Sequence, residues 1–170
     1  MIRALAICFL VFALAGCKKS VTGLAQSREQ AAIDDRRIQE YIDANNLVAT
    51  KVMRGNADTT GIWFVRTSPG TTNALITSSS LLTLGYAGRL LGNNTAFVQT
   101  GDFHPAFRLG EMIKGWQYYF LNKNGGIRKG EKIRLIIASR YAYGPYEQPV
   151  YNLPADAILD FDIELFEVTN

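Results

Sequence analysis

Apolar and polar residues alternate most regularly near the C-terminus, where the pattern predicts a β-strand. The apolar members are Leu159, Phe161, Ile163 and Leu165, and the polar members between them are Asp160, Asp162 and Glu164. A repeat of two residues places one set on each face of a strand, so we expect one buried face and one face in solvent. Shorter apolar runs bounded by Gly, Pro, Asn or Ser predict further strands over residues 47–53, 61–66, 81–91, 95–98, 106–109 and 133–137.

A short helix is expected among these strands. Residues 109–115 form a glycine-containing, loop-like segment, and Trp116 opens a polar-aromatic run over residues 117–121. A short helix and a sheet can each bury an apolar face only against another layer. We therefore expect an α+β fold in which the sheet wraps around Trp116.

A second helix is predicted ahead of the strands. Ser27 and Gln30 match a capping box, so this helix is expected to begin at Ser27 and to end near Asn45. Its narrow apolar stripe consists of Ala31, Ile33, Ile38, Tyr41 and Ile42, and its charged residues Asp34, Asp35, Arg36, Arg37 and Glu40 are expected in solvent. The pattern leaves two options open: the helix packs on its own domain, or it belongs to a self-association surface.

Composition narrows the class of protein. Of the 170 residues, 48% are hydrophobic and 19% are charged, which is typical of one globular domain with extra sequence at an end. The formal net charge is only +3, and Lys or Arg residues occur in runs of at most two. We therefore do not expect the basic surface that nucleic-acid binding requires.

The first residues predict export. Arg3 precedes an apolar stretch over residues 4–15, which is shorter than the roughly 20 residues of a membrane-spanning helix and fits a secretory signal peptide. The stretch leads into Leu14-Ala15-Gly16-Cys17, which resembles a bacterial lipobox, where cleavage leaves a lipidated Cys17 as the new N-terminus. The alternative is an ordinary signal peptide followed by a chance cysteine. With the lipobox, we expect a protein of the cell envelope, anchored through Cys17 in the outer membrane and facing the periplasm.

Several motifs in the second half of the chain occur in an order typical of one family. They are Tyr86-Ala87-Gly88, Phe97, Leu109-Gly110, Ile113-Lys114-Gly115-Trp116, Gly130-Glu131-Lys132, Tyr141-Ala142-Tyr143-Gly144, Leu153-Pro154 and Phe161-Asp162-Ile163-Glu164-Leu165. Each motif alone is weak, but the ordered set resembles the FKBP-type peptidyl-prolyl cis-trans isomerases. The resemblance implies a twisted antiparallel sheet, a half-barrel, wrapped around one short helix. Residues 30–70 are similar to the leader that precedes such domains in bacterial lipoproteins.

This resemblance completes a division of the chain into four parts. We expect a lipoprotein signal peptide over residues 1–16, a flexible tether over 17–26, a helix-strand leader over 27–79, and the FKBP-type domain over 80–170.

The resemblance also implies a shallow aromatic pocket that binds an Xaa-Pro segment of a polypeptide substrate without a metal, cofactor or covalent intermediate. By motif, Trp116 is the pocket floor, the backbone N–H of Ile113 is a donor to the peptide, and the Tyr143 hydroxyl is a donor to a substrate carbonyl. The walls are Tyr86, Phe97, Phe107 and Phe161, the rim includes Met112, and Leu153 borders the mouth. Without the resemblance, Phe107 and Phe161 would be interpreted as ordinary core residues.

One departure from the family pattern has chemical consequences. Family members usually carry an Asp after the residue that matches Phe97, and this chain has Val98, which is expected in the same wall. Two functions therefore stay open: a membrane-anchored isomerase acting on exported proteins, or a catalytically weak or inactive binding lipoprotein of an envelope or gliding-motility complex. His104 is the one histidine, and no Cys or carboxylate cluster has ligand spacing around it, so we expect it in solvent rather than on a metal.

Overall fold

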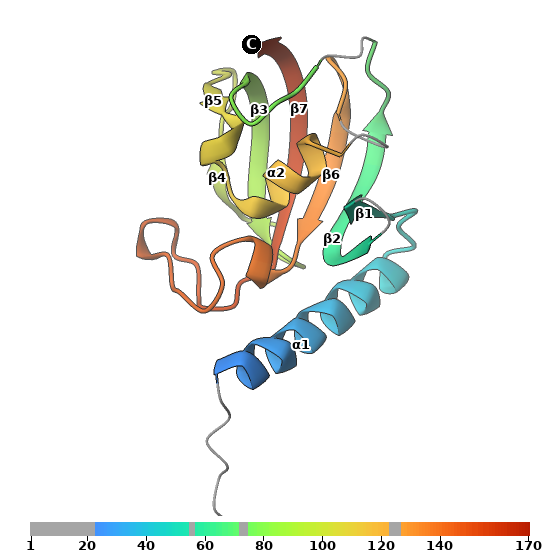
Figure 1. Cartoon of the computed structure of the whole chain (residues 1–170), viewed down its shortest axis with the longest axis vertical. Helices are drawn as coiled ribbons and strands as arrows, with labels where there is room; N and C mark the ends of the chain where they lie inside the picture. The colour runs from blue at the N-terminus through green and yellow to red at the C-terminus, as the bar shows by residue number, and fades with distance from the viewer. Residues whose placement is uncertain (1–22, 55–56, 72–74, 123–126) are drawn as a thin grey trace, which may run out of the picture.

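The computed structural model of the protein describes residues 23–54, 57–71, 75–122 and 127–170. Within these residues, seven strands form one antiparallel sheet with the order β1-β2-β6-β7-β3-β4, and β5 pairs with β3 outside this path (Figure 1). The strands are β1 (Thr50–Arg54), β2 (Ala57–Ser68), β3 (Leu81–Leu90), β4 (Ala96–Gln99), β5 (Ala106–Arg108), β6 (Lys132–Ile137) and β7 (Leu159–Thr169). The helices are α1 (Gly23–Ala44) and α2 (Lys114–Phe120), with 3-10 turns η1 (Leu109–Glu111), η2 (Ser139–Tyr141) and η3 (Pro149–Tyr151).

Helix α2 lies across one face of the sheet, as expected from the sequence (Figure 1). It contributes Trp116, Tyr119 and Phe120 to the main core, where they pack against buried residues of the strands. Gly115 allows a close approach, because a Cβ at this position would lie 2.5 Å from Cγ2 of Ile137 in β6. This packing fixes α2 on the sheet and thereby fixes Trp116.

Helix α1 packs on its own domain, which is the first of the two options that the sequence left open. It crosses one end of the sheet (Figure 1), and its residues Ile38 and Ile42 join a second buried cluster. The sheet and its loops supply Ile136, Ala138 and Ile158 to this cluster. Neighbouring side chains on a strand point to opposite faces. Ile136 therefore packs in the cluster under α1, while Leu135 packs in the main core under α2.

Two expectations about α1 are wrong. The helix already includes Gly23, so Ser27 is not its N-cap; the Ser27 hydroxyl instead donates to the carbonyl of Gly23 inside the helix, at 2.8 Å. Asp34 is 0% exposed rather than in solvent. The reason is tertiary: α1 turns this position toward Ser139 in the loop after β6, and Ser139 donates to the Asp34 carboxylate.

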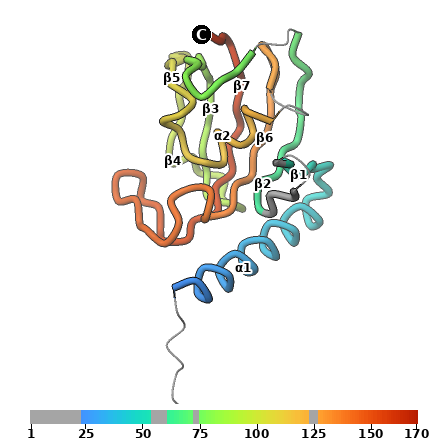
Figure 2. The backbone as a smooth tube through the Cα atoms, viewed as in Figure 1, coloured from blue at the N-terminus to red at the C-terminus, as the bar shows by residue number. Residues whose placement is uncertain are grey.

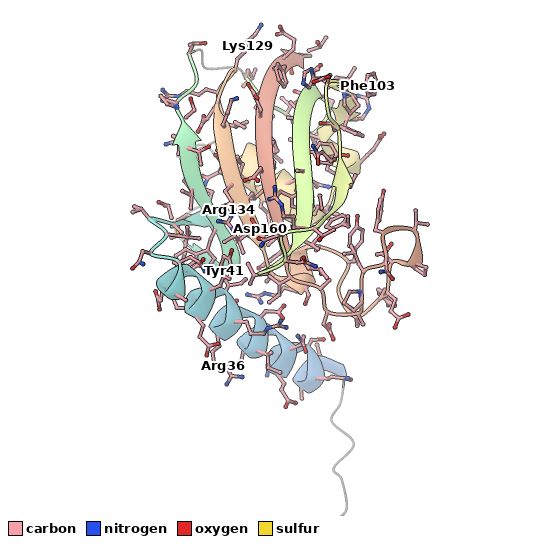
Figure 3. All side chains as sticks on the ribbon, turned by 180° about the vertical axis from the view of Figure 1, so that it is seen from behind. Arg36, Tyr41, Phe103, Lys129, Arg134 and Asp160 are labelled. Atoms are coloured by element: carbon pink, nitrogen blue, oxygen red, sulfur yellow. The ribbon has the colours of Figure 1, made fainter. Side chains whose placement is uncertain are left out.

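The alternation predicted for β7 is confirmed for all but one of its residues. The buried set consists of Leu159, Phe161, Ile163 and Leu165. Asp160, expected in solvent, is only 2% exposed because α1 lies over this part of the sheet. Arg134 of β6 donates through Nε and Nη2 to the two Asp160 carboxylate oxygens, at 2.9 and 2.6 Å, and its Nη2 also donates to the hydroxyl of Tyr41, at 2.7 Å. Figure 3 shows these three residues together where α1 meets the sheet.

The leader region shares the sheet with the rest of the chain. Strand β2 pairs with β6 from Ile62 to Ser68, so residues ahead of position 80 contribute β1 and β2 to one continuous sheet. Residues 23–26, expected in a tether, belong to α1. The expected signal peptide and Cys17 lie outside the described residues. Among the residues that the structure describes, no helix is both long and apolar enough to cross a membrane.

Candidate functional site

A cavity of about 270 Å³ opens between α2, the strands β3 and β4, and the long segment that joins β6 to β7. Its lining residues are Tyr86, Phe97, Val98, Phe107, Glu111, Met112, Ile113, Trp116, Tyr143, Tyr151 and Phe161. The structure therefore brings together all of the pocket residues expected from the sequence except Leu153. Glu111 and Tyr151 are additional members that the sequence did not indicate.

Trp116 lies at the bottom of this pocket. It is 1% exposed, and its backbone N–H donates to the carbonyl of Ile113 at 3.1 Å, which holds it in the first turn of α2. The rings of Tyr86 and Phe161 stand edge-on to the indole. The distance between ring centroids is 5.4 Å for Tyr86 and 5.2 Å for Phe161, and the angles between the ring planes are 88° and 89°. This is the favoured arrangement for aromatic pairs. Aromatic rings therefore form the floor, and the indole Nε1 is buried without a hydrogen-bond partner among the described residues.

The walls continue the same edge-to-face packing from other strands. Phe97 of β4 contacts Phe161 at 6.0 Å and Tyr151 at 5.7 Å between centroids. Phe107 of β5 contacts Tyr86 at 5.9 Å. Each ring is therefore held by at least one other ring, and the pocket is preformed.

The rim between η1 and α2 is fixed by one side chain. Gln117 of α2 donates through Nε2 to the carbonyls of Met112 and Gly110, at 2.6 and 3.0 Å. Ile113 follows with extended backbone angles, φ −58° and ψ 151°, as the residue before the helix. Its amide N–H has no hydrogen-bond partner in the described part of the chain, so this donor is available to a ligand at the pocket edge.

Tyr143 approaches from the segment between β6 and β7, which leaves the sheet at the end nearest α1 (Figure 2). Burial raises the pKa of Tyr143, and the nearby hydroxyls of Tyr151 and Tyr86 raise it further. Burial also raises the pKa of Tyr86, followed by a smaller effect of Tyr151. These hydroxyls are therefore protonated at neutral pH and can donate hydrogen bonds.

The rim of the pocket carries charge, whereas its inner wall is apolar. Glu111 lies at the exposed rim, where its carboxylate is 3.7 Å from the Arg108 guanidinium. Val98 occupies the inner wall beside Phe97, so the wall position where the family pattern has an acid is apolar here. Among the described residues that line this cavity, Glu111 is thus the one acid.

Leu153 is not at the mouth of the pocket. It is 3% exposed and belongs to the main core, and it borders a neighbouring hollow that shares Phe97 and Tyr151 with the pocket. The motif identified Leu153 by its place before Pro154 but could not show that Leu153 packs in the main core while Tyr151 lines the pocket. An aromatic residue in the proline-rich loop was the only available signal for Tyr151.

A larger hollow of about 390 Å³ lies on the other face of the sheet. Its charged side chains are already paired, as in the contact of 3.0 Å between Lys132 and Glu164. His104 borders it, exposed as expected and stacked on Phe166 at 3.8 Å. Of these two cavities, the smaller one combines preformed apolar walls with free donors, so we place the candidate site there.

Comparisons with known proteins agree with this placement. The profile of a family described as FKBP-type peptidyl-prolyl cis-trans isomerase matches residues 73–166. FK506-binding protein 1 of Candida glabrata is 36% identical over 115 residues, which cover 64% of this chain and 93% of that protein. The FKBP-type peptidyl-prolyl cis-trans isomerase FkpA of Buchnera aphidicola is 28% identical over 163 residues, or 89% of this chain and 62% of that protein.

A solved structure gives the same result at the level of the fold. The crystal structure of FkpA from Escherichia coli superposes with a TM-score of 0.61 at 28% identity, covering 86% of this chain and 64% of that one. Because the family profile matches more than half of the chain, the protein belongs to the FKBP-type peptidyl-prolyl cis-trans isomerase family and is an enzyme of that class.

Proposed function

We propose that the protein is a foldase that isomerises Xaa-Pro bonds in exported polypeptides while a lipid on Cys17 tethers it to a membrane. The observation that carries this proposal is the preformed aromatic pocket with two free donors at its edge, the Ile113 N–H and the Tyr143 hydroxyl. A proline ring flanked by peptide carbonyls matches an apolar floor bordered by donors. The substrate class is therefore an extended, proline-containing segment of a polypeptide.

The pocket can lower the barrier without covalent chemistry. Rotation about a peptide bond costs ~18–20 kcal/mol because amide resonance must be lost. The planar amide is more polar than the twisted one, so an apolar pocket over Trp116 disfavours the planar ground state relative to the twisted transition state. Rate enhancement requires only that the twisted form be bound more tightly than the planar form.

The donors at the edge have distinct roles in this scheme. The Ile113 N–H is fixed by the rim that Gln117 holds, and it anchors a substrate carbonyl beside the proline. The Tyr143 hydroxyl donates to a second carbonyl. Donors that are already oriented cost no reorganisation when the bond twists, so both groups hold the flanking backbone in place while the imide bond rotates.

The N-terminal sequence supports the proposed attachment to the cell envelope. The apolar stretch over residues 4–15 and the lipobox-like Leu14-Ala15-Gly16-Cys17 support cleavage before Cys17 and acylation of its thiol. Helix α1 then begins within a few residues of the anchor and would hold the domain close to the membrane, facing the periplasm. In cells, Cys17→Ala should move the protein from the membrane to the soluble fraction. Retention of Cys17→Ala on membranes would contradict lipid anchoring.

The isomerase proposal is tested by exchange NMR on an Xaa-Pro peptide with the full chain. Wild type should speed cis-trans exchange, and Trp116→Ala should abolish the effect because the floor is lost. Tyr143→Phe should reduce it while leaving the fold intact, since only a hydroxyl is removed. Absence of any enhancement at high protein concentration would overturn the proposal.

Val98 favours a second candidate function. With an apolar side chain in place of the acid of the family pattern, the same pocket suits a lipoprotein of an envelope or gliding-motility complex that binds proline-containing segments without turnover. The two functions separate in one titration. Line broadening of the peptide without faster exchange indicates binding alone, whereas exchange cross-peaks that grow with protein concentration indicate catalysis.

A further inference from the structure

Helix α1 contacts the turn that carries Tyr143. This turn begins with η2, whose first residue is Ser139, and the preceding residue, Ala138, provides no side-chain cap. The cap comes from α1 instead. The backbone N–H and the hydroxyl of Ser139 both donate to Oδ2 of Asp34, at 2.9 and 2.6 Å. An acid on the leader helix thus completes the start of a turn that lies 105 residues away in sequence.

Hydrogen bonds satisfy both oxygens of the Asp34 carboxylate. It is buried, and its other oxygen, Oδ1, accepts a hydrogen bond from Nε2 of Gln30 at 2.8 Å. Burial of an acid is costly unless hydrogen bonds replace water. The three donors supplied by Ser139 and Gln30 meet that condition, so the carboxylate is held in one place.

Ser139 extends the contact to the residues beside Tyr143. Its carbonyl oxygen accepts hydrogen bonds from the amides of Ala142, at 2.9 Å, and Gly144, at 2.8 Å. Gly144 has a φ of +61°, a left-handed conformation that glycine adopts without strain. The backbone on both sides of Tyr143 is therefore held by the residue that Asp34 holds.

A neighbouring residue ties the same turn to α1 a second time. The Arg140 guanidinium donates to Oδ1 of Asp35 at 2.7 Å and to the carbonyl of Ala31 at 3.3 Å. It also lies over the ring of Tyr141, at 5.1 Å from the centroid. Tyr141 in turn contacts Tyr118 of α2, with ring centroids 5.6 Å apart. The turn is therefore fixed between the two helices.

We propose that Asp34 is a positioning residue for Tyr143: through Ser139, the leader helix sets the turn that presents the Tyr143 hydroxyl to the pocket. This inference rests on the proposed function, in which that hydroxyl contacts the substrate. Asp34 acts only through Ser139, so its loss should misplace the hydroxyl and leave the pocket floor unchanged. Small displacements of a positioned group are enough to slow a reaction substantially.

The chain offers a matched control on the same helix. Asp43 accepts a hydrogen bond from Gln39 at 2.8 Å, with the same spacing as Asp34 and Gln30, but it is exposed. In the full chain, Asp34→Asn should lower kcat/KM for peptide isomerisation roughly three- to thirtyfold. Asp43→Asn should leave kcat/KM unchanged. Wild-type kcat/KM in a folded Asp34→Asn protein would overturn the proposal.

A double variant separates positioning from a general structural role. In a Tyr143→Phe background, Asp34→Asn should cause no further loss of kcat/KM, because the hydroxyl that it positions is already absent. A full, multiplicative loss would show that Asp34 acts on something other than Tyr143. Ser139→Ala, which keeps the amide donor and loses only the hydroxyl, is milder and serves the same comparison where Asp34→Asn does not fold.

Amide hydrogen exchange tests, independently of turnover, whether the contact between Asp34 and Ser139 orders this turn. In Asp34→Asn, the amides of Ala142 and Gly144 should exchange at least about tenfold faster than in wild type, and in Asp43→Asn they should not change. Unchanged exchange rates in Asp34→Asn would contradict the role of Asp34 in ordering this turn even if kcat/KM fell. If wild type has no isomerase activity, the proposed function fails, and the exchange rates still decide whether Asp34 orders this turn.

Discussion

The ring of Phe161 lies so close to the backbone of Gly88 that a Cβ at Gly88 would come within 2.6 Å of Cε1 of Phe161. The two residues face each other across the β3–β7 pair. The same Cβ would lie 2.9 Å from Cζ of Phe97. Because Gly88 has no side chain, two aromatic walls of the pocket can meet above it.

Gly88→Ala should therefore damage the pocket. The added methyl group would push Phe161 or Phe97 from its position, with a loss of about 1–3 kcal/mol in the free energy of unfolding, as expected for overpacking. Isomerase activity should fall further than the unfolded fraction explains. Urea denaturation and exchange NMR measure the two effects. Gly23→Ala is the control, since a Cβ there meets nothing within 4 Å; equal behaviour of the two variants would contradict this role for Gly88.

Val98→Asp should raise the isomerisation rate. Val98 lies in the pocket wall with Tyr86, and a carboxylate there can accept a hydrogen bond from a pocket hydroxyl and fix its orientation. We expect kcat/KM to rise about tenfold, which corresponds to about 1.4 kcal/mol of transition-state stabilisation. Val98→Asn has nearly the same shape without the charge and should give a smaller gain. A rate that does not rise would show that the apolar wall is not what limits turnover.

The site residues that could be predicted from the sequence lie in strands or a helix that local patterns mark. Tyr86, Phe97 and Phe107 lie on strands whose apolar runs marked them, and Trp116 lies in the one helix that the sheet must cover. Local patterns, together with the order of the motifs, were enough to place these residues. The same patterns gave the limits of β3, β4 and β6 to within one or two residues.

Long-range packing explains why some residues were predicted in the wrong environment. Asp34 lies outside the apolar stripe of a predicted helix, and Asp160 is a polar member of an alternating strand pattern, so local pattern placed both in solvent. Both are buried because α1 folds back over the sheet and the segment after β6, and no local repeat encodes that contact. Leu153 was misplaced for a related reason, since the course of an irregular loop depends on what it packs against.

Tyr119 should make stability depend on pH in the alkaline range. Burial raises the pKa of Tyr119 well above its ordinary value, and the charge of Glu131 raises it further, while Arg66 acts in the opposite direction. In the unfolded chain a tyrosine ionises near pH ~10, so above that pH the folded state retains a proton that the unfolded state loses. The contribution is complete below pH ~10 and falls as pH rises, by about 1.4 kcal/mol per pH unit.

Tyr119→Phe isolates this effect. Free energies of unfolding from urea titrations between about pH 8 and pH 11 should fall less steeply in Tyr119→Phe than in wild type above pH ~10. Below pH ~9 the two curves should run parallel, because neither state of either protein exchanges a proton at this position. Curves that stay parallel over the whole range would contradict a raised pKa for this hydroxyl.

Asp160→Asn should destabilise the contact between α1 and the sheet. The change leaves the Arg134 guanidinium without its carboxylate in a region covered by α1, and loss of one partner of a buried ion pair costs about 3–5 kcal/mol. Tyr41→Phe removes only the hydroxyl that accepts from Arg134, so its cost should be about 1 kcal/mol. Urea denaturation measures both.

Asp162→Asn supplies the comparison that makes this prediction specific. Asp162 lies on the same strand and pairs with Arg89 at 2.7 Å, but its side chain is 53% exposed. Exposed pairs contribute only about 0–1 kcal/mol, so Asp162→Asn should stay close to wild type. Replacing both Arg134 and Asp160 with Met and Leu should recover most of the loss of Asp160→Asn, because no unpaired charge remains under α1. A loss in Asp160→Asn no larger than that in Asp162→Asn would show that the burial of this pair contributes nothing to holding α1 on the sheet.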